Sequence, residues 1–375
     1  LGRGAQSLFE MSIRVLGGLL SAHSLSGEEL FLSNAKSLAD VFLHAYKTDS
    51  GMPLGQVDVR TGKATRHGWM SHAVLAEVTT VQLEMNYLTH STGEQKYQAA
   101  GDKALQAVLK AAGSRGLVPV FLKHEKDPKF VGGKLSLGAM GDSYYEYLLK
   151  QWIQTGKQDT RLKDKWKKAM KEMMDGLVQE TEGGLTYVAE KDNGHLKHRM
   201  DHLACFVGGM LMLGARSLPA DEVDPRWEDV AAGIAQTCYE MYRRSPTGLA
   251  PEYVNFLPQN KKPTDMSIPK DGAYNILRPE AIETLFYMHY YTGDPKYRDW
   301  AAEMFRAFVK HTKAKYGFSA VRDVMRDPPD KSDSMESFFL AETLKYFFLI
   351  FSPRDKISLE EFVFNTEAHP LRVWQ

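Results

Sequence analysis

Acidic residues recur near the start of the helices that the sequence predicts to be most buried. An unpaired carboxylate in apolar surroundings is strongly penalised, so each of these residues needs a structural or a chemical reason. Two arginines stand in the same stretches. The acids are Glu10, Glu77, Asp142, Asp201, Glu280, Glu283 and Glu336, and the arginines are Arg14 and Arg278. If the helices surround one axis, these side chains meet at one end of it.

Two explanations account for such acids. A single acid in a first helical turn complements the helix dipole and the free N–H groups, a contribution of about 0.3–1 kcal/mol. A group of carboxylates in one pocket instead favours a cation, a polyhydroxylated ligand, or general acid–base chemistry. Capping is the better explanation for any one acid, but it accounts less well for six helices at once. Hydrolysis of carbohydrate uses all three features of such a pocket.

These acids lie within a sequence repeat of roughly 65 residues. Glycine followed by an apolar residue recurs at Gly51, Gly116, Gly184, Gly248 and Gly317. A second pattern, Ser or Thr before Gly, recurs with the same period at Gly27, Gly93, Gly156 and Gly293. Each repeat therefore contains two helices joined by turns.

The two helices of a repeat differ in character. The segment 161–178 has one apolar face at a helical period, which is typical of an outer helix, whereas 137–152 is apolar nearly all round. We expect inner helices near 7–23, 72–91, 138–155, 199–215, 278–291 and 334–350, with five outer helices between them. This alternation predicts an all-α, αα-barrel fold, although an open solenoid shares it. Closure would require a further N-terminal helix pair.

Composition excludes several classes of protein. The 375 residues include 47 basic and 47 acidic side chains, which give no net charge to attract nucleic acid. The most apolar stretch, 338–351, contains Glu342 and Lys345, so no membrane span is expected. The two cysteines, Cys205 and Cys238, are too few for a disulfide scaffold, and composition leaves a pair and two free thiols equally open.

One competing motif is a run of histidines. His195, His198 and His202 could approach a zinc ion, but no paired cysteines or HExxH motif accompany them. A place for His202 in the wall of a pocket is the better interpretation. No nucleophile elbow, phosphate-binding loop, EF-hand or dinucleotide motif is found in the sequence.

Several ordered strings resemble a known family, the class I α-1,2-mannosidases of glycoside hydrolase family 47. The resemblance spans the whole chain and is carried by residues 9–20, 141–148, 200–206, 277–280, 335–340 and 364–370. It implies an (αα)7 barrel forming a single catalytic domain, 1–375, with its first helix pair missing. It also implies removal of mannose with inversion, which requires two carboxyl groups about 6.5–9.5 Å apart.

The resemblance assigns roles to the acids. Glu280 matches the base that activates water, and Glu10 matches the usual candidate for the acid, acting directly or through a water molecule. Asp142 matches an acid on the other side of the sugar. We favour Glu10 as the acid, with Asp142 orienting the water or supporting the charge of the transition state.

The resemblance also implies a calcium ion. Thr366 matches the direct ligand, through its hydroxyl and its carbonyl, and water molecules held by carboxylates complete an oxygen-rich shell. Phe338 matches the aromatic platform under the sugar. The carboxylates are Glu77, Glu283, Glu342 and Glu367, and the remaining residues that would line the pocket are Arg14, His202 and Arg278.

In this family Cys205 and Cys238 match a disulfide, which indicates an oxidising compartment. The resemblance therefore implies the lumen of the secretory pathway, endoplasmic reticulum or Golgi, with high-mannose N-glycans as partners. We expect a monomer, with any membrane attachment through a missing N-terminal anchor. The alternative function is a mannose-binding quality-control lectin with weak turnover.

One departure bears on specificity. Members that remove a single mannose in the endoplasmic reticulum carry Arg two residues before the position of Asp142, and this chain has Met140 there. Met140 predicts a broader, Golgi-type trimming range, whereas residues 143–156 look closer to the reticulum type.

Overall fold

The computed structural model describes residues 4–68, 70–256 and 265–374, and its helices follow the predicted alternation. Its contacts divide the chain into two compact units. Unit 1 comprises residues 1–136, 140–172 and 359–375, and unit 2 comprises residues 137–139 and 173–358. The single domain expected from the resemblance stays a prediction.

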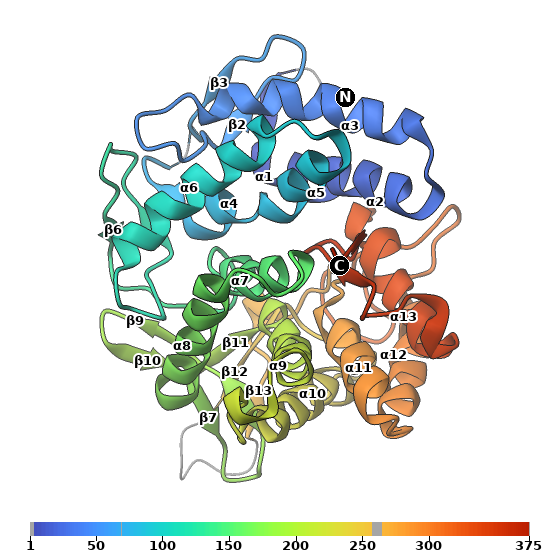
Figure 1. Ribbon diagram of the computed structural model, residues 1–375. Helices are drawn as coiled ribbons and strands as arrows, with labels where there is room; N and C mark the ends of the chain where they lie inside the picture. The colour runs from blue at the N-terminus through green and yellow to red at the C-terminus, as the bar shows by residue number, and fades with distance from the viewer. Residues whose placement is uncertain (1–3, 69, 257–264, 375) are drawn as a thin grey trace. The chain divides into compact units, whose positions relative to one another are not determined.

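Unit 1 contains the first inner and outer helices (Figure 1). The first inner helix is continuous through α1, a π-helical segment at Met11–Leu16, and α2. Helix α2 packs on α3 and α5, and α5 packs on α6 and α7. The bounds are α1 Leu8–Glu10, α2 Gly17–Ser26, α3 Glu29–Phe42, α4 Leu75–Thr79, α5 Gln82–Thr92, α6 Lys96–Ala112 and α7 Asp142–Gln154; α8, Thr160–Gly176, begins in unit 1 and ends in unit 2.

Unit 2 continues the same alternation. Helix α11 contacts α9, α10, α12 and α13, and these helices lie side by side in Figure 1. The bounds are α9 Phe206–Ser217, α10 Trp227–Arg243, α11 Glu280–Thr292, α12 Lys296–Thr312 and α13 Leu344–Phe351, which follows a π-helical segment at Phe339–Thr343. All five predicted outer helices, α3, α6, α8, α10 and α12, are confirmed.

Burial follows the two sequence patterns. Every residue of α7 after Asp142 is buried, whereas α6 buries only the face that carries Tyr97, Ala104 and Val108. A helix that is apolar all round must be covered on every side, while an amphipathic helix needs cover on one. The predicted Ser/Thr-Gly marks end three inner helices: Gly27, Gly93 and Gly293 adopt left-handed conformations as caps of α2, α5 and α11.

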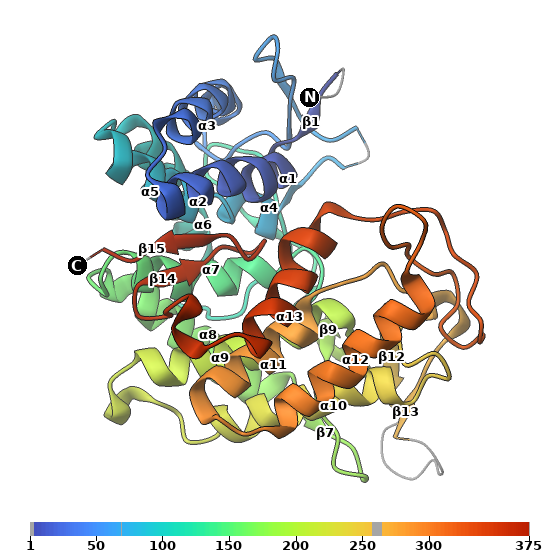
Figure 2. The same cartoon turned by 90° about the vertical axis from the view of Figure 1, so that its right-hand side faces the viewer.

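Short antiparallel strands occupy the longer loops. In unit 1 they pair as β1-β2-β3, β4-β5-β6 and β14-β15, and in unit 2 as β7-β8, β9-β10 and β11-β12-β13. Figure 2 shows the β14-β15 hairpin, which contacts α7 and α2 within unit 1. The bounds are β1 Gln6–Ser7, β2 Gln56–Val57, β3 Ala64–Thr65, β4 Ala73–Val74, β5 Phe121–Leu122, β6 Phe130–Val131, β7 Val178–Glu180, β8 Thr186–Val188, β9 Glu190–Asp192, β10 His195–Lys197, β11 Arg199–Asp201, β12 Tyr253–Phe256, β13 Met266–Ser267, β14 Phe362–Phe364 and β15 Pro370–Arg372.

The strands correct two predicted helix boundaries. Residues 199–201 are strand β11 rather than the first turn of an inner helix, because Asp201 pairs with Tyr253 of β12. The following residues, His202–Cys205, form a short 3-10 turn that leads into α9. The inner helix predicted at 72–91 begins as strand β4 and is then divided into α4 and α5, with Thr80 and Val81 non-helical between them.

The predicted disulfide is present in unit 2. Cys205 and Cys238 are bonded, with their Cα atoms 6.0 Å apart, and they join the start of α9 to α10. No helix in the described ranges has the length and apolar character needed to cross a bilayer.

Candidate active-site residues

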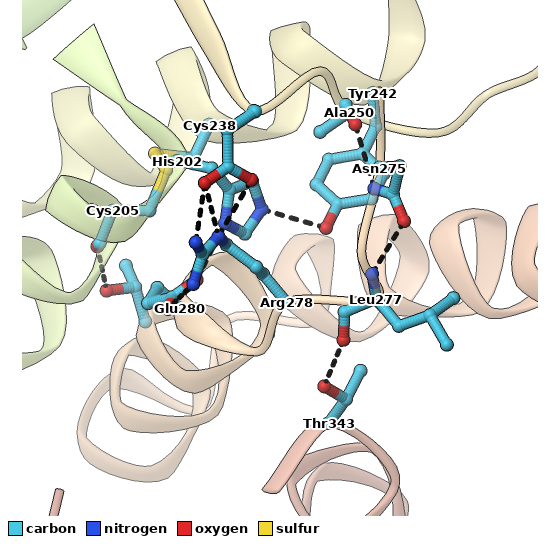
Figure 3. Close-up of polar contacts among 12 residues, drawn as sticks. His202, Cys205, Cys238, Tyr242, Ala250, Asn275, Leu277, Arg278, Glu280 and Thr343 are labelled. Atoms are coloured by element: carbon cyan, nitrogen blue, oxygen red, sulfur yellow. Dashed lines mark hydrogen bonds and ion pairs between the residues drawn. A yellow bond between two sulfur atoms is a disulfide. The ribbon is translucent and has the colours of Figure 1, made fainter. Parts of the chain in front are cut away.

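Glu280 is a buried acid of unit 2 that contacts His202 and Arg278 (Figure 3). It is the first residue of α11 and is 8% exposed. His202 Nδ1 lies 2.7 Å from Glu280 Oε2, and Tyr242 Oη lies 2.9 Å from the other ring nitrogen of His202. Arg278 Nη1 lies 3.9 Å from Glu280 Oε1. The structure therefore brings together three residues predicted to line one pocket.

The surroundings of Glu280 favour its ionised form. Burial acts to raise the pKa of this carboxyl, but the hydrogen bond and charge of His202, together with the charge of Arg278, outweigh burial. The pKa of Glu280 consequently lies below its ordinary value. A carboxylate that stays ionised although it is buried is suited to accept a proton.

The effect of His202 on Glu280 can be tested through the pH dependence of activity. In a His202→Gln variant the imidazole beside Glu280 is lost while burial remains, so the pKa of Glu280 should rise. Because the ionised form accepts the proton, the acidic limb of kcat/KM should move to higher pH. A Tyr242→Phe variant keeps the His202 imidazole beside Glu280 and serves as the control. A profile of His202→Gln that overlays the wild-type profile would show that His202 does not tune Glu280.

Arg278 is held from its other side by Glu252. Arg278 Nε lies 2.8 Å from both carboxylate oxygens of Glu252, so the guanidinium is fixed by a charged pair. The Arg278 guanidinium also lies 6.0 Å from the centroid of the Phe338 ring, which is 6% exposed. Glu252 lies directly before strand β12, and its carbonyl accepts the backbone N–H of His202 at 2.8 Å.

Two further acids of unit 2 are buried, as predicted. Glu283 lies one turn after Glu280 on α11, and Tyr346 Oη donates to Glu283 Oε1 at 3.3 Å. Glu342 lies in the π-helical segment that precedes α13. Buried carboxylates of this kind need hydrogen bonds or a cation to remain ionised.

In unit 1, Arg14 joins two predicted site acids. Arg14 Nε lies 2.6 Å from Glu10 Oε2, one turn earlier on the same helix, and Arg14 Nη1 lies 3.3 Å from Glu367 Oε1. The π-helical segment begins directly after Glu10. Such segments occur frequently at functional sites. The Glu10 side chain is 45% exposed, which leaves it accessible to a ligand.

Glu77 also belongs to the acid group of unit 1. His67 Nε2 lies 2.8 Å from Glu77 Oε2. Burial raises the pKa of Glu77, His67 opposes this rise, and the negative charge of Glu10 adds to it. The electrostatic influence of Glu10 places the two acids near one another.

Asp142 is the first residue of α7, and the cap residue of this helix is Gly141. Asp142 Oδ1 accepts the backbone N–H of Ser143 at 2.8 Å, which satisfies one of the free N–H groups in the first turn. This contact and the helix dipole account for an acid at this position whatever its further role. Met140, two residues earlier, adopts a left-handed backbone with φ of 76°, and its carbonyl accepts the N–H of Ala76.

Thr366 lies in the turn between β14 and β15. Its backbone N–H donates to Tyr147 Oη at 3.4 Å, and within the described residues its hydroxyl and carbonyl oxygens accept no hydrogen bond. These two oxygens, with the buried carboxylate of Glu367 beside them, match the hard oxygen donors that calcium prefers. The residues of this turn therefore fit the ion that the resemblance implies.

The histidine run does not form a metal centre in the described part of the chain. No group of three or more His, Cys, Asp or Glu side chains with metal-binding geometry occurs there. His195 is exposed in β10, His198 contacts Tyr187 Oη, and His202 contacts Glu280 and Tyr242. The three histidines therefore have separate environments, and the place of His202 in a pocket wall stays a prediction.

Three residues that hold the predicted site side chains were not found from the sequence. Glu252 forms an ion pair with Arg278, the Tyr242 hydroxyl contacts a ring nitrogen of His202, and His67 contacts the Glu77 carboxylate. Glu252 and His67 lie in loops without a recurring spacing, and Tyr242 is one of several buried aromatic residues on α10. Only their position in space distinguishes them from ordinary loop and core residues.

Comparison with known proteins places the chain in a family. The model of glycosyl hydrolase family 47 matches residues 3–373. The endoplasmic reticulum mannosyl-oligosaccharide 1,2-alpha-mannosidase of Homo sapiens is 43% identical over 377 residues, covering 98% of this chain and 53% of the human protein. Mannosyl-oligosaccharide alpha-1,2-mannosidase IA of Drosophila melanogaster is 41% identical, covering 98% of this chain and 55% of the fly protein.

A solved structure agrees with these matches. The alpha-1,2-mannosidase from Trichoderma reesei superimposes with a TM-score of 0.91 at 28% identity, covering 100% of this chain and 83% of that chain. This likeness confirms the predicted αα-barrel fold class. The chain spans about half the length of the two curated relatives. Because the family model extends over nearly every residue, the chain belongs to glycosyl hydrolase family 47.

Proposed function

We propose that residues 1–375 form the catalytic domain of a calcium-dependent, inverting exo-α-1,2-mannosidase. Its substrates are high-mannose N-glycans in the lumen of the endoplasmic reticulum or Golgi, from which it removes terminal mannose. The observation that carries the proposal is the buried Glu280, which His202 and Arg278 keep ionised. The disulfide supports an oxidising compartment, and the printed names of the relatives support the substrate class.

In the proposed reaction, Glu280 accepts a proton from a water molecule as the water oxygen attacks the anomeric carbon. The bond from that carbon to the bridging oxygen breaks, and Glu10 supplies a proton to this oxygen, directly or through a water molecule. The products are β-mannose and a glycan that is shorter by one residue. Asp142 orients the water or supports the positive charge that develops on the sugar ring.

Other residues bind and orient the sugar. Phe338 offers an apolar ring face to the sugar, and Arg14 and Arg278 offer hydrogen-bond donors to its hydroxyl groups. His202 acts behind them, because its two ring nitrogens are occupied by Glu280 and Tyr242. Thr366 would hold the calcium ion directly, and Glu77, Glu283, Glu342 and Glu367 would hold the surrounding water molecules. When bound, the ion would supply coordination positions for sugar hydroxyl groups.

Proton NMR of a nine-mannose glycan tests the reaction, the metal and the linkage together. Incubation with the protein and calcium should release mannose that appears first as the β-anomer, and a chelator should stop the release. First appearance of the α-anomer would contradict the role of Glu280. Release that continues in chelator would contradict the calcium requirement, and tight binding without release would favour the lectin-like alternative. The sizes of the shortened glycans would show which trimming range Met140 permits.

A further inference from the structure

A buried group of polar side chains lies beneath the turn that carries Thr366 and Glu367. The turn spans residues 365–369, between β14 and β15. Asn365, which is 1% exposed, uses its whole amide group there. Its Oδ1 accepts the backbone N–H groups of Glu367 and His369, both at 2.9 Å, and its Nδ2 donates to Ile13 O at 2.9 Å and to Glu84 Oε1 at 2.8 Å. Two donors and two acceptors exhaust the capacity of an amide side chain.

The turn is tightly constrained at Asn365. Ala368 adopts a left-handed backbone with φ of 55°, a conformation that a residue with a Cβ rarely takes unless its surroundings impose it. The Asn365 amide also approaches α2 closely, because a Cβ on Gly17 would lie 2.5 Å from Asn365 Nδ2. The bonds of Asn365 to its own turn, to the π-helical segment at Met11–Leu16 and to α5 are therefore what impose the shape of the turn.

Glu84 lies at the base of this network. It is completely buried on α5, and its Oε1 accepts both Asn365 Nδ2 and Tyr147 Oη at 2.8 Å. Its Oε2 has no hydrogen-bond partner among the described residues. Burial raises the pKa of Glu84 to about 7, against the opposing effect of its two hydrogen bonds. Packing alone does not explain a carboxyl group buried in this way, because an apolar side chain would fill the space without the free-energy cost of desolvation.

Each of the two hydrogen bonds of Glu84 connects it to Thr366 through one other residue. One passes through Asn365, the residue before Thr366 in the chain. The other passes through Tyr147, whose hydroxyl oxygen also accepts the backbone N–H of Thr366. Residues from α5 and α7 are thus connected to a single turn of the β14-β15 hairpin.

We propose that Glu84, Tyr147 and Asn365 are positioning residues that fix the hydroxyl and carbonyl oxygens of Thr366 for a calcium ion. The proposal rests on the calcium site of the proposed function. Ligand distances in metal sites lie within about 0.2 Å of their usual values, so a ligand in a turn between two short strands needs support of this kind. The three residues act through the turn and do not themselves touch the ion or the substrate.

Tyr147→Phe tests the proposal, because it deletes a single hydroxyl group. Tyr144→Phe and Tyr145→Phe are matched controls on the same buried helix. The hydroxyl of Tyr144 has no partner in the described structure, and that of Tyr145 contacts only the backbone of Val118. In chelator, amide hydrogen exchange at residues 366–369 should be about tenfold faster in Tyr147→Phe, because the hydroxyl loses its hydrogen bonds to Glu84 and to the backbone N–H of Thr366. The two controls should exchange like the wild type.

Calcium affinity is the second measurement. Competition with a fluorescent chelator should show calcium binding about 10- to 100-fold weaker in Tyr147→Phe, as expected when support of a metal ligand is removed. Tyr144→Phe and Tyr145→Phe should bind calcium as the wild type does. A network that served only general stability would lower the Tm of Tyr147→Phe without a selective change in calcium affinity.

A pair of Glu84 variants keeps the proposal falsifiable if Tyr147→Phe folds poorly. Glu84→Gln retains the oxygen that accepts both hydrogen bonds and should preserve slow exchange and calcium affinity. Glu84→Leu removes that oxygen, so amide exchange at residues 366–369 should become faster and calcium binding should become weaker. Unchanged exchange in Tyr147→Phe and Glu84→Leu would overturn the proposal. If the wild type binds no calcium but exchange responds as described, the calcium site of the proposed function fails while the control of the turn by the network stands.

Discussion

Glu280→Gln is expected to lower kcat for mannose release by about 10²- to 10⁴-fold, the usual loss when a general base is removed. Glutamine has the size of glutamate but cannot accept the proton of the attacking water. Its amide oxygen can still face His202, which lies 2.7 Å from Glu280 Oε2. Glycan affinity should therefore change far less than kcat. Single-turnover kinetics and a separate binding measurement distinguish the two quantities.

A matched control uses the same substitution elsewhere in unit 2. Glu228 on α10 forms an exposed pair with Arg216 at 2.8 Å, and exposed pairs of this kind contribute less than about 1 kcal/mol. Glu228→Gln should leave kcat unchanged. Azide provides a further check, since a small anion that needs no deprotonation should restore turnover to Glu280→Gln and yield β-mannosyl azide. Retention of more than a tenth of wild-type activity would show that Glu280 is not the base.

Removal of the Cys205–Cys238 disulfide is expected to lower the free energy of unfolding by roughly 3–4 kcal/mol. The bond closes a loop across a sequence separation of 33 residues, and the chain-entropy model assigns this magnitude to a loop of that size. Such a loss is a large share of the ~5–15 kcal/mol of a typical protein. Urea unfolding of a Cys205→Ala/Cys238→Ala variant, followed by circular dichroism, measures the effect.

The same variant also loses two buried sulfur atoms, and reduced wild-type protein separates the two effects. Reduction breaks the cross-link but keeps the sulfur atoms, so most of the destabilisation should appear in both samples. The bond between Thr284 Oγ1 and the carbonyl of Cys205 at 2.6 Å does not depend on the disulfide and should keep α9 near α11. A reduced wild type as stable as the oxidised protein would show that the cross-link itself contributes little.

The helices could be predicted because their information is local. A buried helix such as α7 carries apolar residues on nearly every side, an outer helix such as α8 has one apolar face, and glycine ends several inner helices. The strand at Arg199–Asp201 could not be predicted in the same way. It forms because β12, about 50 residues later in the chain, supplies its hydrogen bonds.

The acids of the site could be found because a carboxylate in an apolar helix is conspicuous in any sequence. Glu280, Glu283 and Glu77 were identified by this signal, whereas Thr366 and Phe338 were identified only through the family resemblance. Their roles stay predictions. The disulfide pairing also came from the resemblance, and it is confirmed.

By itself, the sequence determined the alternation of helices, the burial of each helix and the list of acids, because these depend on residue type and on spacing along one segment. Tertiary structure alone decided which acid stays ionised and which residues hold it. His202 and Glu280 are 78 positions apart, and Glu84 and Asn365 are 281 positions apart. Hydrogen bonds and electrostatic interactions act over a few ångströms in space, so residues distant in sequence determine the chemistry of each carboxylate only after the chain has folded.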